Sequence, residues 1–126
     1  MIHDKDYILR IVRQLSAALA KIILDKNERK LIEFEGVFET QTNDVFKMDF
    51  EELLLKSTEE ISDFVNQKEI SQHADYYELL GNIFYLKGSE YDDKTFLNKA
   101  KTFYELYLQK SGIFSLVIIS RINELE

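Results

Sequence analysis

The stretch 77–108 constrains the fold of this 126-residue chain more than any other segment. The missing side chain of Gly81 would let a neighbouring helix approach closely, which can outweigh the roughly 1 kcal/mol that glycine costs inside a helix. Residues three and four apart share one face of a helix, so the spacing predicts two packed helices. The residues that carry this spacing are Tyr77, Leu80, Gly81, Phe84, Ala100, Tyr104 and Leu108.

The same residues resemble one tetratricopeptide unit, which begins aromatic-x2-Leu-Gly-x2-aromatic and continues with small-x3-aromatic. The chain departs from that pattern in having no tryptophan at the first position and no terminal proline. Ala100 also follows Gly81 later than a period of roughly 34 residues allows. We therefore expect a first helix ending near Gly88 and an enlarged turn at 89–93. An ordinary helical hairpin with a coincidental glycine is the alternative.

The composition favours helices nearly everywhere, because the chain has no proline and only four glycines. Its length and 45% hydrophobic residues suit one domain with its own core. Without cysteine there is no disulfide and no thiolate site, which fits a reducing compartment.

The net charge and the N-terminal residues limit which partners and which cellular location we expect. A net charge of −7 argues against nucleic acid, which requires a basic surface. No segment reaches the roughly 18 apolar residues of a membrane span. The N-terminus carries Asp4 and Asp6 instead of a basic signal region. We expect a soluble, unprocessed protein of the cytoplasm.

Two helices are predicted in the first third of the chain. The first is capped by Asp4 or Asp6, runs to about Asp25, and has apolar residues on enough of its surface to contact two or more neighbours. Asn27 would cap the second, which is expected to fray at 40–43. Gly36 is interpreted as a site of close packing. The apolar residues expected to face the first helix are Leu31, Phe34, Val37 and Phe38.

Capping signals follow. Asp49 with Glu52, and Ser57 with Glu60, precede apolar runs, which fits two short helices or one kinked helix. The apolar run 116–119 fits a strand or a helix, and we choose a helix that covers the open side of the hairpin.

The whole is expected to be an all-α, tetratricopeptide-like bundle of about five to six helices in one domain, 1–126. It divides into a helix pair (1–48), short helices (49–70), and the hairpin with its capping helix (71–126). The residues Asp6-Tyr7-Ile8-x-Arg10 and Leu15-x3-Leu19-Ala20-Lys21-Ile22 also resemble the opening of a family of small, uncharacterised bacterial helical proteins. That resemblance implies a fold and no chemistry.

Tetratricopeptide domains bind extended peptides along the first helix of each hairpin, and by that resemblance Asp75, Glu78, Asn82 and Tyr85 would line the groove. Carboxylate-binding members carry a lysine one turn before the asparagine, where this chain has Glu78. We therefore expect a basic or neutral segment as the ligand. A solvated polar helix face is the alternative.

Chemistry is not expected. Glu69 and His73 stand four residues apart but lack the second Glu-x-x-His copy of di-metal bundles. No nucleophile motif or glycine-rich phosphate loop is present. The sequence thus predicts no cofactor, no metal and no enzyme.

Two functions remain from the sequence. The first is a non-catalytic protein-interaction module. The second is a small accessory or regulatory subunit that acts through homodimerisation, motivated by surplus apolar residues on the first helix and at 116–119. Under this second hypothesis a charge at Ile118 should change the mass in solution.

Overall fold

The computed structural model describes residues 4–25 and 28–126, and these parts of the chain contain helices and no strand. The expected all-α class is confirmed. Residues 4–25 and 28–126 hold seven α-helices instead of the expected five to six, because 49–69 forms two separate helices, and a short 3-10 turn follows at Ile70–Gln72. The elements are α1 (Asp4–Asp25), α2 (Glu28–Phe46), α3 (Phe50–Leu55), α4 (Thr58–Asn66), η1 (Ile70–Gln72), α5 (His73–Tyr91), α6 (Lys94–Ser111) and α7 (Leu116–Glu124).

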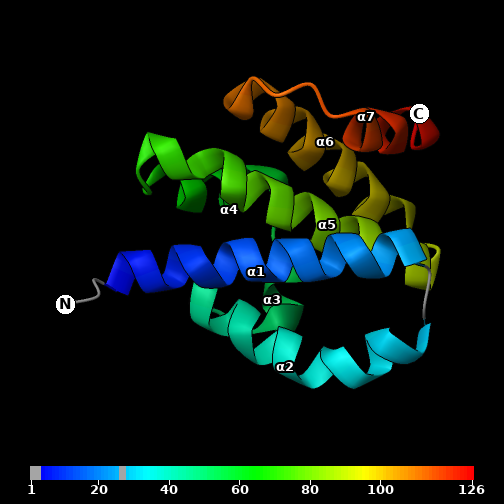
Figure 1. The fold of residues 1–126 in the computed structure, drawn as a ribbon, viewed down its shortest axis with the longest axis horizontal. Coiled ribbons are helices and arrows are strands. Elements are labelled where there is room, and N and C mark those ends of the chain that lie inside the picture. Colours follow the sequence, from blue (N-terminus) through cyan, green and yellow to red (C-terminus); the bar gives the residue numbers. More distant parts are fainter. Residues whose placement is uncertain (1–3, 26–27) are drawn as a thin grey trace.

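The long helices stack as successive layers, in the order α2, α1, α5 and α6, with α7 against α6 at the far side from α2 (Figure 1). The short helix α3 contacts α2, and α4 contacts both α5 and α6. None of the described helices is long and apolar enough to cross a membrane.

Helix α1 lies between two neighbours, α2 and α5, as its wide apolar surface predicted. Helix α1 begins at Asp4, so Asp4 and Asp6 both lie inside it and neither is its N-cap, contrary to the expectation. Asn27 lies outside the described residues. The side chains of α1 that enter the core are Ile11, Val12, Leu15, Leu19 and Ile22.

Helix α2 corrects three expectations. It continues past 40–43 to Phe46, because the hydroxyl of Thr42 is buried and donates to the carbonyl of Phe38 instead of competing with the helix. Gly36 is exposed with nothing within 4 Å of an added Cβ, so it is not a site of close packing. Val37 is exposed, and only Phe38 of the predicted contacts is shown buried. The side chains of Leu31 and Phe34 lie outside the described residues.

The capping box at Ser57 and Glu60 is confirmed, with both reciprocal hydrogen bonds present. The hydrogen bonds from Ser57 lower the pKa of the Glu60 carboxyl. Asp49 precedes α3, but its side chain makes no capping hydrogen bond.

Helices α5 and α6 form the predicted hairpin, and a Cβ at Gly81 would overlap the ring of Tyr104. The expected turn at 89–93 is wrong. Helix α5 continues to Tyr91 and ends with Asp92 in the left-handed conformation (φ 51°), which leaves a short turn. Gly88 lies inside the helix because Leu97 packs on it, where an added Cβ would come within 2.7 Å of the leucine side chain.

The run 116–119 forms the start of α7, and the helical interpretation is confirmed. Gly112 ends α6 with φ 66°, and the connection 112–115 leads to Ser115, whose side chain accepts from the amide of Ile118. Ile118 and Ile122 are buried against the core.

Candidate functional site

The four predicted groove residues lie on α5, and the structure places them against the chain's own helices. Asp75 pairs with Arg13 of α1 at 3.3 Å. Glu78 accepts a hydrogen bond from the hydroxyl of Ser16, also on α1, at 2.9 Å. This face of α5 is therefore in contact with α1, and a partner-binding role for these residues stays a prediction.

Asn82 is the centre of a buried polar cluster and is 1% exposed. Its Nδ2 donates to the carbonyl and to the hydroxyl of Ser16, both at 3.1 Å. Its Oδ1 accepts from the Tyr104 hydroxyl at 2.7 Å and from Arg121 at 3.1 Å. One amide side chain thereby links α5 to α1, α6 and α7.

Arg121 enters this cluster from α7 and is 8% exposed. Besides Asn82 it donates to the Tyr104 hydroxyl at 3.1 Å, and its guanidinium lies 5.5 Å from the ring centre of Tyr85. Burial raises the pKa of Tyr104 well above its usual range, although Arg121 opposes that shift. The cluster holds a cation against neutral acceptors, which fits positioning of helices more than proton transfer.

Tyr85, the fourth predicted groove residue, contacts α7. Its hydroxyl donates to Glu124 at 3.1 Å, and its ring lies 6.1 Å from that of Tyr104. Burial and the Glu124 charge raise the pKa of Tyr85. The structure thus brings all four residues together along α5 but divides them between two covering helices.

Sequence reasoning did not find Ser16, Tyr104 or Arg121 as members of a polar cluster. The available signal was Arg121 itself, because it stands between apolar Ile118 and Ile122 on the face of α7 that had to be buried. A buried arginine requires hydrogen-bond acceptors. Asn82 could supply one, because its side-chain amide is uncharged and stands among the apolar residues of α5.

His73 is buried, and its Nε2 lies 2.8 Å from the carbonyl oxygen of Lys68. A carbonyl oxygen only accepts hydrogen bonds, so Nε2 carries a proton and donates it to the backbone of Lys68. Within the described ranges no three His, Cys, Asp or Glu side chains are grouped to hold a metal ion.

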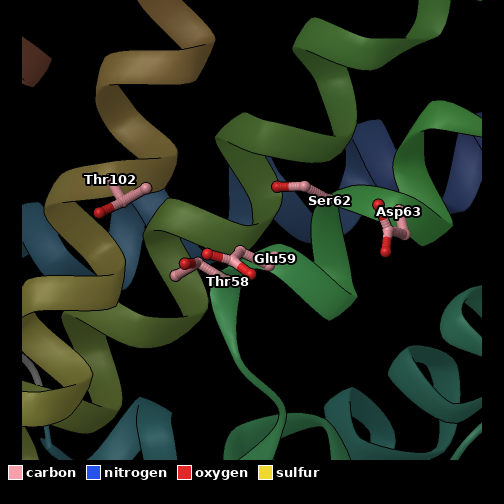
Figure 2. A pocket seen from close by; sticks show the side chains of 5 residues that line it. All are labelled: Thr58, Glu59, Ser62, Asp63 and Thr102. Atoms are coloured by element: carbon pink, nitrogen blue, oxygen red, sulfur yellow. The ribbon is translucent and has the colours of Figure 1, made fainter.

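A shallow hollow of ≈ 400 Å³ lies between α4 and α6, lined by Thr58, Glu59, Ser62, Asp63 and Thr102. Figure 2 shows that these side chains do not converge on one point, since Asp63 lies on the far side from Thr102. The hydroxyl of Thr102 donates to its own helix, at the carbonyl of Asn98. The lining has hydroxyls and carboxylates but no histidine or lysine.

An exposed apolar surface occurs where α6 leads into α7. Four large apolar residues lie within five positions, and we call them the 113–117 surface. They are Ile113 (56% exposed), Phe114 (77%), Leu116 (71%) and Val117 (54%). Other exposed apolar residues, such as Leu55 and Ile70, stand singly in the sequence, which is ordinary for a folded protein.

The predicted apolar run 116–119 is therefore divided by the helix. Its residues Leu116 and Val117 face solvent, whereas Ile118 is 4% exposed. A charge at Ile118 would disturb the core and is the wrong probe for a surface contact.

No family model matches this sequence, and searches of curated proteins and of solved structures found no match either. The function is accordingly argued from the geometry above.

Proposed function

We propose that the chain is a non-catalytic protein-interaction module that binds a protein partner through the 113–117 surface. The observation that carries the proposal is the exposure of four large apolar side chains between residues 113 and 117. Burying such side chains in a partner is worth about 25 cal/mol per Å² of apolar surface removed from water. A contiguous exposed apolar patch is a typical mark of an interaction site.

The proposal fits a tetratricopeptide-like hairpin, the architecture that the sequence resembles. The antiparallel α5 and α6, with Gly81 under Tyr104, support that resemblance. In this proposal α1 covers the face of α5 that carries Asp75, Glu78 and Asn82, so binding moves to the outer side of the bundle. We place the module in the cytoplasm, because a chain without cysteine fits a reducing compartment. The family that its opening residues resemble is bacterial.

The test is capture of partners from a bacterial lysate with the immobilised chain, analysed by mass spectrometry. The double variant Phe114→Ser with Val117→Glu should fold normally, because these exposed side chains contribute little to folding. The amount of any specific partner that it captures should fall at least tenfold, because the apolar contact is lost. Leu55→Ser combined with Ile70→Glu is the matched control, since it removes two apolar residues elsewhere that are at least as exposed. Equal capture by the two double variants would reject the 113–117 surface.

A further inference from the structure

The 113–117 surface lies within the longest stretch of the C-terminal third that carries no charge. Residues 111–120 contain no Asp, Glu, Lys or Arg, although these make up 31% of the chain. Two copies with a net charge of −7 repel each other at a distance. An uncharged surface is one through which identical copies can meet without placing like charges opposite each other.

The charges that flank this stretch are of opposite sign. Lys110 is exposed in the last turn of α6. Glu124 is exposed at the end of α7, where the helix dipole adds negative charge. Nearby, Glu126 is paired with Lys101 at 3.6 Å. Each copy therefore offers a positive end before the apolar surface and a negative end after it.

The two charges stand on opposite sides of Ser115 along the chain. Lys110 precedes it in the last turn of α6, and Glu124 follows it at the end of α7. In Figure 1 the connection and α7 follow one another in the same general direction along the outer side of the bundle. A two-fold axis near Ser115 reverses this direction in the second copy, so it would place Lys110 of each copy on the side of Glu124 of the other.

From these observations we infer that the occupant of the 113–117 surface is a second copy of this chain, docked antiparallel about a two-fold axis near Ser115. The inference rests on the proposed function and names its partner. Such an interface is self-complementary, because each residue pair occurs twice. Phe114 and Val117 supply the apolar centre, and the paired Lys110 and Glu124 fix the direction of approach.

The experiment is sedimentation velocity of the full chain over a wide dilution range. The wild type should form a dimer that dissociates on dilution, and Val117→Glu should remain a monomer throughout. Ile70→Glu is the control, because it places the same charge at an exposed apolar residue outside the surface, and it should dimerise as the wild type does. A monomeric wild type, or a dimer that Val117→Glu leaves intact, overturns the inference.

Charge reversal tests the two-fold arrangement. Lys110→Glu and Glu124→Lys should each weaken self-association by about tenfold, since each change turns two exposed attractions into repulsions. An equimolar mixture of the two variants should recover the wild-type dimer. No recovery in the mixture would refute the antiparallel arrangement. A monomeric wild type whose 113–117 surface still captures a lysate protein would refute the second copy alone and leave the proposed function standing.

Discussion

The cluster around Asn82 and the 113–117 surface reverse the usual placement of polar and apolar groups. Asn82 and Arg121 are buried and hydrogen-bonded to each other and to Tyr104, and Asn82 also bonds Ser16, whereas Phe114 is 77% exposed. In the first region polar groups stabilise the fold because they have partners inside it. In the second, apolar groups contribute little to the fold because their partners lie outside it. The position of a residue in a contact network therefore indicates its role better than its polarity does.

The largest effect is expected from Asn82→Leu, which should lower the free energy of unfolding by about 3–5 kcal/mol. The change removes the acceptor of a buried arginine and the donor to Ser16, so Arg121 is left with a partly uncompensated charge. Urea unfolding followed by circular dichroism would measure it. Asn98→Leu, at an exposed position of α6, is the control and should change stability by less than about 0.5 kcal/mol. Similar values for both would show that the cluster does not stabilise the fold.

Two glycines sharpen the contrast between packed and open regions. Gly81→Ala should destabilise the protein by about 1–3 kcal/mol, because its Cβ would meet the Tyr104 ring. Gly36→Ala should stabilise it by up to about 1 kcal/mol, because the position is helical and open. Thermal unfolding of both variants is the measurement. A stabilising change at Gly81 would mean that α6 moves away at little cost.

Alkaline pH should weaken the buried cluster before it affects the 113–117 surface. The pKa of Tyr104 is raised in the folded state, so its contribution to stability is complete below pH 10 and is lost as pH rises towards the folded pKa. By pH 11 this one group should remove about 1.4 kcal/mol. Urea unfolding between pH 8 and pH 11, compared with Tyr104→Phe, isolates the effect. An equal decline in that variant would assign it to the other tyrosines with raised pKa values, Tyr76, Tyr85 and Tyr107.

The smallest effect is expected at the exposed aromatic residue. Phe114→Ser should change the free energy of unfolding by less than about 0.5 kcal/mol in dilute protein solution, since the exposed ring contributes little to the fold. Denaturant unfolding measures this, with buried Phe103→Ala as the comparison that should cost about 3–5 kcal/mol. A large loss at Phe114 would show that the 113–117 surface is part of the folding core.

Local patterns predicted much of the helical structure. The apolar spacing of α1 and the capping box at Ser57 were sufficient, because each depends on neighbours within a few positions. Gly81 was predicted from its place in the repeat-like spacing, although its partner Tyr104 lies on the next helix. The same patterns failed at Gly36 and Gly88. In the sequence, a glycine at an open surface cannot be told from one that is closely packed or one at a helix end. Only the neighbouring helix distinguishes these cases.

The sequence by itself determined that this chain is helical and where its hairpin forms. Tertiary structure decided which face of α5 is covered and which apolar residues remain exposed. The reason is the separation of the partners. Asn82 meets Ser16 at 66 positions along the chain and Arg121 at 39, whereas helical periodicity informs only on residues three or four apart. The docking of α7 likewise buries Ile118 and leaves Val117 in solvent, a choice that neither residue type makes alone.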